Sequence, residues 1–299
     1  MSAGAGLDRR VAGLSLSGGE AGRRRLLVAI AYGLPVAFIL LPLVLFLVYS
    51  FFWVERTEMH YDVSLLNYQR FFAEETFLRV FRQTCVLCLE VSVLTIAFAY
   101  PVAYFLAGLS GRKKYILIML LLVPLLMSYI IKIYAIRSIL GGTGFLNRTL
   151  MATGIIDEPL TIFVFNLNAI LLTQTVLLIP FAVLPIFLSL ERIPRNLLEA
   201  SADLGASNWL TFARVVAPLS MPGVVAAGTF VFVLAIGDFL TPQMVGGQSG
   251  FTFGRIIYSQ FGTAFNWPFG AALSVILAVV VIVAIGIGQR FGVKQGATT

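Results

Sequence analysis

Six long apolar runs, separated by short polar segments, constrain the fold of this chain more than any other feature. They cover residues 26–54, 81–109, 115–140, 162–190, 219–240 and 267–289. Each run is long enough for an α-helix to cross the hydrocarbon core of a bilayer, which takes roughly 20 residues. In the whole chain 59% of residues are hydrophobic and only 12% are charged, more apolar surface than a soluble domain can bury. The sequence therefore predicts an all-α membrane protein with six transmembrane helices.

The positions of Lys and Arg predict the orientation of these helices. The chain has 21 Lys and Arg against 14 acids, a net charge of +7. In a membrane protein such an excess indicates orientation rather than nucleic-acid binding, because loops rich in Lys and Arg stay in the cytoplasm. Of the 21, 13 lie in the two termini and in the segments that follow the second and fourth runs. This bias predicts that both termini are cytoplasmic.

The same pattern divides the chain into five parts. Residues 1–25 form a cytoplasmic tail, and residues 26–54 form a first membrane helix that is too long for the apolar part of a signal peptide. Residues 55–79 form an outer loop with a short amphipathic helix. A five-helix core follows over residues 80–290, and residues 291–299 form a cytoplasmic tail.

Few residues in the chain could support catalysis or metal binding. His60 is the only histidine, and Cys85 and Cys88 are the only cysteines. The two cysteines lie in an apolar helix, where small packing residues are a simpler interpretation than a redox pair. We therefore predict no metal site and no catalytic residue. A membrane enzyme or a channel is the rival class, and an enzyme would need a nucleophile–base pair or clustered metal ligands within the helices.

The polar segment between the fourth and fifth runs predicts two short helices joined by a turn. Residues 197–204 have helical spacing, and Gly205 can adopt the positive φ that ends a helix. Ser207 is a suitable N-cap for a second helix that carries Trp209, and Pro218 ends that helix or begins the next span. Such an elbow is suited to docking against another protein. The alternative is an amphipathic linker on the lipid surface.

The spacing in the elbow resembles the EAA loop of ABC-importer permeases, E-A-A-x3-G-x9-I-x-L-P. The matching residues are Glu199, Ala200, Gly205 and Pro218. The departures are Ser201 for the second Ala, Val215 for Ile and Ala217 for Leu. The resemblance implies an ATPase-coupling role for Glu199, Ala200, Ser201, Asp203, Gly205, Trp209 and Pro218.

Two further stretches resemble the spermidine/putrescine permease family. They are GDFLTP at residues 237–242, followed by Gly246 and Gly247, and NWPFGAA at residues 266–272. The resemblance covers roughly residues 80–290 and implies the type I ABC-importer permease fold, with a five-helix permease core and an added first helix. It implies three kinds of protein partner: a second permease subunit in a heterodimer, two cytoplasmic ATPase subunits that bind ATP and Mg, and a periplasmic substrate-binding protein. Membrane lipid is a further expected partner, because the spans are apolar.

The chain itself contains no GxxxxGK[ST] phosphate-binding loop, so we expect no cofactor on it. We expect a bacterial inner-membrane permease for a small cationic solute, most simply a polyamine such as spermidine or putrescine. An amino-acid derivative, an opine-like compound or a quaternary amine is the alternative solute.

Charged residues inside the predicted helices are candidates for the solute pathway, because such residues are costly there and usually face a cavity or a partner. Glu90, Lys132 and Asp238 lie in the outer part of their helices. In one interpretation Lys132 pairs with Glu90 or Asp238. In the other, a carboxylate binds a solute ammonium and aromatic faces add cation–π attraction. The candidate faces are Trp267, Tyr104, Tyr134 and Phe239.

Prolines inside the predicted helices suggest points of flexibility. Pro101, Pro124, Pro180 and Pro185 could act as hinges or as simple packing kinks. Gly223 would add to the pliability of the fifth helix. In span four, Asn166, Asn168 and Gln174 could line a pathway or bridge neighbouring helices by hydrogen bonds.

Overall fold

The structure is a computed structural model that describes residues 18–55 and 58–296. The ends of the two predicted tails, residues 1–17 and 297–299, lie outside the described residues. The chain divides into two units, Met1–Tyr49 and Ser50–Thr299, and each is described by itself.

The described part of the first unit is one helix, α1 (Gly18–Tyr49), with Pro35 and Pro42 inside it. It begins at Gly18 rather than at residue 26, so part of the predicted tail is helical. It ends at Tyr49 rather than at residue 54. Its segment Leu26–Tyr49 has a mean hydropathy of 2.5, and the large apolar side chains around this segment are exposed. A helix that is apolar on every side suits contact with lipid.

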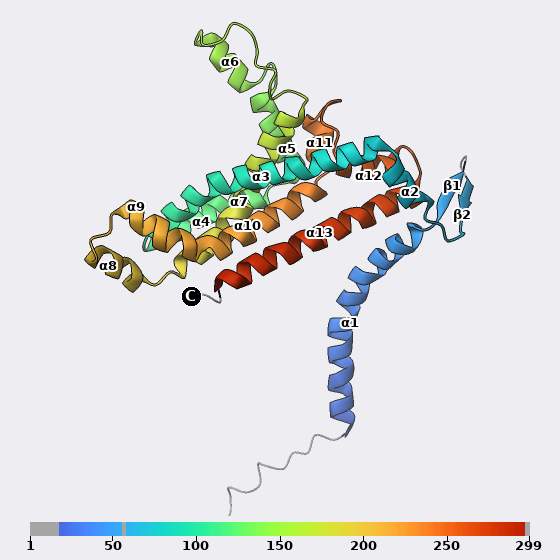
Figure 1. Cartoon of the computed structure of the whole chain (residues 1–299), viewed down its shortest axis with the longest axis horizontal. Helices are drawn as coiled ribbons and strands as arrows, with labels where there is room; N and C mark the ends of the chain where they lie inside the picture. The colour runs from blue at the N-terminus through green and yellow to red at the C-terminus, as the bar shows by residue number, and fades with distance from the viewer. Residues whose placement is uncertain (1–17, 56–57, 297–299) are drawn as a thin grey trace, which may run out of the picture. The chain divides into compact units, whose positions relative to one another are not determined.

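The second unit is built on four long helices that lie side by side, as Figure 1 shows. They are α3 (Glu75–Gly108), α7 (Leu167–Glu191), α10 (Ala217–Gly237) and α13 (Trp267–Gly296). The buried seam between α3, α7 and α10 is rich in alanine and β-branched residues, among them Ala99, Ala103, Ala182, Val183, Ala227 and Val231. Small residues let membrane helices approach closely, and van der Waals packing then holds them together.

The helices α7 and α10 pack closely at Gly223. A Cβ atom at this position would lie 2.4 Å from the Cβ of Ser189 and 2.7 Å from the carbonyl oxygen of Pro185. Gly223 therefore serves close packing, which is a different role from the pliability expected from the sequence. The helix α7 continues through both Pro180 and Pro185.

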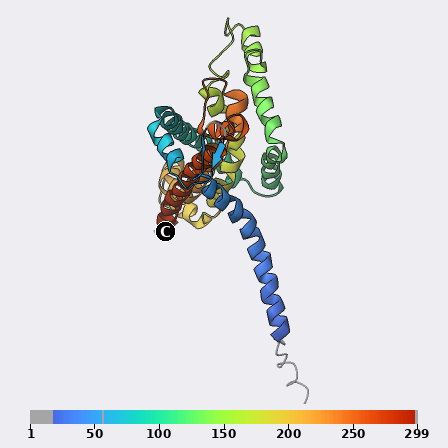
Figure 2. The same ribbon diagram turned by 90° about the vertical axis from the view of Figure 1, so that its right-hand side faces the viewer.

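The predicted third span is a pair of helices with a sharp break between them. The helix α4 (Arg112–Leu126) ends shortly after Pro124, and α5 (Tyr129–Leu140) begins after two extended residues, Met127 and Ser128. The segments Arg112–Leu126 and Tyr129–Ala152, the second of which contains both α5 and the helix that follows it, meet at an angle of 97°. From the break, α5 leads towards α6 (Phe145–Ala152) and away from the four long helices, as Figures 1 and 2 show. The predicted outer loop after residue 140 therefore contains a helix.

Among the described residues, five helices are long and apolar enough to cross a membrane, or six if the broken pair counts as one span. The predicted number of spans corresponds to the second way of counting. The described residues also include one two-stranded antiparallel sheet, β1 (Trp53–Glu55) with β2 (Glu58–His60).

Short elements close the end of the bundle where α3 begins. The helix α2 (Leu66–Ala73) confirms the predicted short amphipathic helix. Phe71 of α2 packs edge to face against Phe253 of α12 (Phe253–Gly262), with the ring centroids 5.8 Å apart. The short helix α11 (Leu240–Val245) connects α10 to this region.

Candidate functional site

The predicted elbow is present at the opposite end of the bundle (Figure 1). The first helix is α8 (Arg195–Asp203), and Gly205 after it has a φ of +74°. The Ser207 side chain accepts a hydrogen bond of 3.3 Å from the backbone N–H of Leu210, which caps the second helix, α9 (Asn208–Thr211). The predicted helix, glycine turn and N-cap are confirmed. The hydroxyls of Ser201 and Thr211 lie 2.7 Å apart and tie the two short helices together.

The outer surface of the elbow combines acidic and large apolar side chains. Leu204 is 88% exposed and Trp209 is 74% exposed, and the side chains of Glu199 and Asp203 lie on the surface as well. Exposed leucine and tryptophan residues beside carboxylates form a surface that a protein partner can cover, with an apolar centre and a charged rim.

The elbow continues directly into the fifth span. A single π-helical turn, η1 (Phe212–Val216), joins α9 to α10, and Pro218 is the second residue of α10. The helix runs without a break from Asn208 to Gly237, so Pro218 lies inside it and neither ends the second elbow helix nor opens a separate span, the two roles expected for it. The Phe212 ring meets the rings of Tyr100 and Tyr104 edge to face, with centroids 5.9 and 5.7 Å apart. Phe212 thereby connects the elbow to α3.

A cavity of about 630 Å³ lies between the elbow and the bundle, lined in part by Tyr104, Arg195 and Phe212. At its edge the ammonium of Lys114 donates a hydrogen bond of 2.5 Å to the carboxylate of Glu191. Tyr104 was expected to provide an aromatic face in the solute pathway. It lies instead at the elbow end of α3, next to Phe212, where it cannot accompany Asp238.

Asp238 lies just past the end of α10, and its carboxylate is held by three neutral donors. The Tyr129 hydroxyl donates a hydrogen bond of 2.7 Å, the Gln174 side-chain amide one of 3.0 Å and the backbone N–H of Thr241 one of 3.1 Å. Gln174 is only 2% exposed, and its Oε1 atom has no hydrogen-bond partner among the residues that the structure describes. Asp238 thus joins α5, α7, α10 and α11.

The ion pairs expected for Lys132 are not formed. The ion pairs among the described residues are Arg70–Glu74, Arg79–Glu75 and Lys114–Glu191. The ammonium of Lys132 lies 5.3 Å from the centre of the Tyr129 ring, a cation–π contact. Glu90 is exposed and lines a separate cavity of about 380 Å³ together with Arg79 and Arg82. Lys132 therefore contacts an aromatic ring where a carboxylate was predicted, and Asp238 accepts hydrogen bonds from a hydroxyl and two amide groups where an ammonium was predicted.

The other aromatic residues predicted for the solute pathway are distributed over separate places. Trp267 packs against Phe261, with the centroids 6.4 Å apart. Phe239, next to Asp238, stacks on Tyr258 at 4.7 Å. Tyr134 lines yet another cavity. The structure of this chain alone does not gather them around one cation site.

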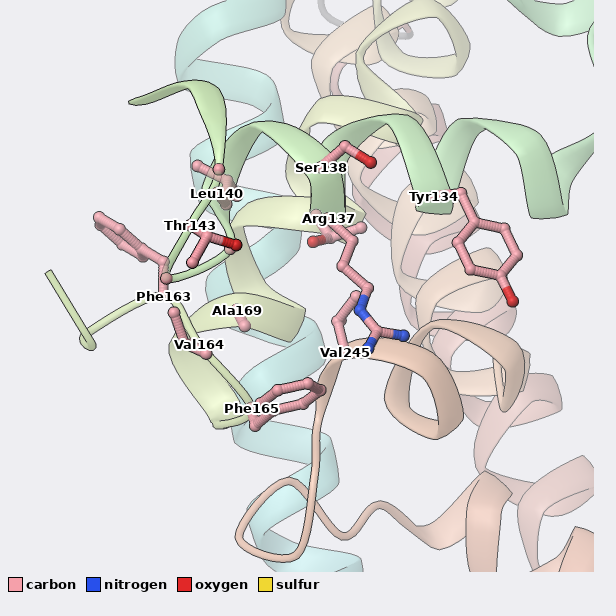
Figure 3. A pocket seen from close by; sticks show the side chains of 14 residues that line it. Tyr134, Arg137, Ser138, Leu140, Thr143, Phe163, Val164, Phe165, Ala169 and Val245 are labelled. Carbon is pink, nitrogen blue, oxygen red and sulfur yellow. The ribbon is translucent and has the colours of Figure 1, made fainter. Parts of the chain in front are cut away.

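The cavity at Tyr134 has a volume of about 530 Å³ and lies between α5, the start of α7 and the end of α11. Figure 3 shows the Arg137 side chain extending into it from α5, with Phe165 and Val245 beside the guanidinium. The guanidinium carbon lies 5.0 Å from the centre of the Phe165 ring. This cavity was not predicted from the sequence.

The described residues contain no group of three or more His, Cys, Asp or Glu side chains arranged to hold a metal ion. His60 stacks on Trp53 across the two-stranded sheet, with the rings 4.2 Å apart. Cys88 is buried in the α3–α7–α10 seam, and Cys85 is half-buried.

Comparison with known proteins decides the family. No family model matches the chain. The chain is 34% identical over 249 residues to the spermidine/putrescine transport system permease protein PotB of Escherichia coli (strain K12), covering 83% of this chain and 90% of PotB. The chain belongs to the PotB-like family of ABC transporter permeases. PotB of Haemophilus influenzae is 30% identical over 268 residues, and covers 89% of this chain and 93% of its own. The inner membrane ABC transporter permease protein YdcU of Escherichia coli (strain K12) is 32% identical over 244 residues, 77% of each chain.

Solved structures agree with this assignment at the level of the fold. A bacterial ABC transporter for alginate import matches with a TM-score of 0.71 at 15% identity, over 92% of this chain and 98% of its own. The MetNI methionine ABC transporter matches with a TM-score of 0.55 at 19% identity, over 73% and 95%. The PotB-like chain thus has the predicted ABC-importer permease fold. It is a multi-pass inner-membrane protein and a component of a transport system.

Several residues that organise this PotB-like chain were not predicted to do so. Phe212 is one apolar residue among many in the sequence, and only its position in a π-helical turn distinguishes it. Tyr129 carries no distinguishing signal in the sequence, and Gln174 is predicted only to line a pathway or to bridge helices. A buried glutamine in an apolar helix is the signal that could have indicated a specific partner. Asn166 forms the N-cap of α7, with its side chain accepting from the backbone N–H of Ala169.

Proposed function

We propose that this chain is the permease subunit of an ATP-driven importer that carries a polyamine such as spermidine or putrescine across the bacterial inner membrane. The observation that carries the proposal is the 34% identity to PotB, a spermidine/putrescine permease, over 83% of the chain. The working assembly would contain a second, different permease subunit, two cytoplasmic ATPase subunits that bind ATP and Mg, and a periplasmic binding protein. Both termini of this chain would be cytoplasmic.

In this mechanism the elbow receives the force of ATP binding. The exposed residues Leu204 and Trp209, with Glu199 beside them, would enter a groove of one ATPase subunit. Closure of the ATPase pair would push on α8 and α9. Because η1 and α10 continue from α9 without a break, the push would tilt the fifth span and switch the cavity between its inward- and outward-facing forms.

The Asp238 carboxylate is our candidate for binding a solute ammonium. Its three partners are neutral donors, so among the described residues no cation compensates its charge. A charge-assisted hydrogen bond from an ammonium would supply that compensation. Glu90 is the second candidate carboxylate, and its exposed position leaves it free to meet a solute or the second permease subunit.

Uptake by cells tests the proposal. Cells that lack this permease should lose ATP-dependent uptake of radiolabelled putrescine or spermidine, and the gene supplied on a plasmid should restore it. Unlabelled polyamines should compete, whereas excess of an amino-acid derivative, an opine-like compound or a quaternary amine should not. Competition by one of these compounds alone would assign the transporter to that solute class. Uptake that persists without ATP would indicate a channel.

Assembly and orientation need separate tests. A tagged ATPase subunit should co-purify with the wild-type chain, and Glu199→Lys should weaken that association if the groove of the ATPase subunit is basic.

Thiol labelling tests the orientation of the chain. In a variant without Cys85 and Cys88, a new cysteine near Glu158 or Ser249 should react with an impermeant thiol reagent applied from outside. One near Ala206 should remain unlabelled in intact cells stripped of the outer membrane. The reverse pattern would overturn the proposed orientation and the role of the elbow with it.

A further inference from the structure

The cavity of about 530 Å³ at the end of α5 has one charged residue in its wall. Of its 14 lining residues only Arg137 carries a charge, and the rest of the wall is apolar or neutral. Four hydroxyl-bearing residues also line it: Tyr134, Ser138, Thr143 and Thr173. Cavities of roughly 300–1,000 Å³ with mainly apolar walls and a few polar groups are typical of small-molecule sites.

The guanidinium of Arg137 is positioned with free donors. It belongs to none of the ion pairs among the described residues, and its contact is with the face of the Phe165 ring at 5.0 Å. A cation–π contact does not use the N–H groups as hydrogen-bond donors, and none of the side-chain hydrogen bonds among the described residues involves the Arg137 guanidinium. In Figure 3 the guanidinium lies beside Val245 and near Phe165, at the end of the side chain that extends from α5.

The aromatic wall below Arg137 is held in an unusual backbone conformation. Phe165 has a φ of +53°, which is rare for a bulky residue and persists only where the surroundings impose it. Gly247 fits against the backbone of Phe165 so tightly that a Cβ there would lie 2.7 Å from the Phe165 carbonyl oxygen. The hydroxyl of Ser249 donates a hydrogen bond of 3.1 Å to the same oxygen, and Arg255 holds the carbonyl of Gly247. The loop that contains Gly247 and Ser249 therefore holds Phe165 in its strained conformation.

The opposite wall is fixed as well. Gly141 and Gly144 form a turn in which a Cβ at Gly144 would lie 2.6 Å from the carbonyl oxygen of Ile139. Asn147, only 1% exposed, donates hydrogen bonds to the carbonyls of Gly141 and Leu160 and accepts one from the backbone N–H of Leu160. Both walls are thus set by specific contacts.

We propose that this cavity binds a small organic acid, with its carboxylate on the edge of the Arg137 guanidinium and its apolar body against Phe165 and Val245. The guanidinium fork matches a carboxylate with two parallel hydrogen bonds. The absence of an acidic residue from the lining leaves that fork for a ligand. A cationic solute would be repelled here, so the site is distinct from the one proposed at Asp238. The inference goes beyond the proposed function and does not depend on it.

Binding of benzoate to the full chain in nanodiscs of uncharged lipid tests the proposal. Saturation-transfer NMR should show saturable binding of benzoate, whereas benzylamine, with the same ring and the opposite charge, should not bind. Arg137→Gln should weaken benzoate binding about tenfold or more, because a charge-assisted pair is lost. Arg137→Lys, which keeps the charge without the fork, should have an intermediate effect. Arg148→Gln removes an exposed arginine of α6 that does not line the cavity, and it should leave binding unchanged.

Three results would overturn the proposal. One is equal binding of benzoate and benzylamine, which would indicate an apolar site only. The second is unchanged benzoate binding in a monodisperse, helical preparation of Arg137→Gln. The third is loss of wild-type benzoate binding when anionic lipid is added to the nanodiscs, which would identify the occupant as a lipid headgroup. None of these results bears on polyamine uptake, so this proposal and the proposed function can fail separately.

Discussion

The carboxylate of Asp238 accepts a hydrogen bond of 2.7 Å from the hydroxyl of Tyr129, although Lys132 lies on the same helix one turn further along. Lys132 contacts the Tyr129 ring instead of the carboxylate. Tyr129 is the first residue of α5, directly after the break in the third span. Asp238 therefore fixes the start of the segment that leads away from the bundle, in addition to any contact it makes with a solute.

This relationship predicts how Asp238 variants behave. Asp238→Leu should lower the thermal unfolding temperature of the detergent-solubilised chain, because the donors on Tyr129 and Gln174 lose their acceptor. Each unsatisfied donor costs about 1–3 kcal/mol. Asp238→Asn keeps an acceptor and the shape of the side chain, so it should retain most of the stability while uptake falls. Size-exclusion profiles after heating provide the stability measurement.

The double variant Asp238→Asn with Lys132→Met separates this arrangement from an ion pair. If Asp238 balanced the charge of Lys132, removal of both charges would restore both abundance and uptake. With Tyr129 and Gln174 as the partners, the second change should bring no recovery. Recovery of uptake in the double variant would contradict both the hydrogen-bond network and the solute-site proposal.

The local features of this chain could be predicted because they depend on neighbouring residues. Apolar runs predict spans, and Gly205 and Ser207 predict the turn and the cap of the elbow. The partners of Asp238 could not be predicted, because Tyr129 and Gln174 are 109 and 64 residues away in the sequence. Pairing by opposite charge was the natural expectation, and neutral donors took that place. The positive φ of Phe165 depends on Gly247 in another loop, and no rule of local propensity indicates it.

The positive φ at Gly205 predicts that a β-branched side chain at this position will disturb the turn of the elbow. Its φ of +74° disfavours a β-branched residue by roughly 1–2 kcal/mol, although no atom of the described residues lies within 4 Å of a Cβ placed there. Gly205→Val should therefore insert normally but present α8 and α9 at a wrong angle, and ATPase co-purification and uptake should fall. Gly205→Asn is the matched control, since asparagine tolerates this conformation. Normal uptake by a well-expressed Gly205→Val variant would argue against docking through the elbow.

Gly223 predicts a packing defect. Gly223→Ala places a methyl group against Ser189 and the Pro185 carbonyl, and overpacking of this kind costs about 1–3 kcal/mol. The unfolding temperature should fall accordingly. Gly228→Ala is the control on the same helix, because its new methyl group meets only the flexible end of Ile96 at 3.0 Å. Equal effects of the two variants would show that α7 and α10 adjust freely at Gly223.

We expect replacement of Phe212 to weaken the coupling between ATP hydrolysis and transport while the ATPase still docks on the elbow. Its ring contacts Tyr100 and Tyr104 of α3 and stacks on Trp209 of α9, while its backbone opens the π-helical turn below the elbow. Such turns often mark functional sites. Phe212→Leu keeps the apolar volume but removes aromatic pairs worth roughly 0.5–1.5 kcal/mol each. The ATPase should still co-purify, and ATP hydrolysis should continue, but less solute should be transported per ATP hydrolysed.

The control for Phe212 is Phe230, which lies on α10 and meets Phe181 of α7 edge to face at 5.8 Å. Phe230→Leu removes an aromatic pair of the same kind from the same continuous helix, away from the elbow. It should leave the ratio of transport to hydrolysis unchanged. Restoration of the ratio by Phe212→Tyr or Phe212→Trp would show that an aromatic edge against α3 is what the position requires. An equal drop in the ratio for Phe212→Leu and Phe230→Leu would reduce the effect at Phe212 to general packing and leave the link between elbow and α3 without support.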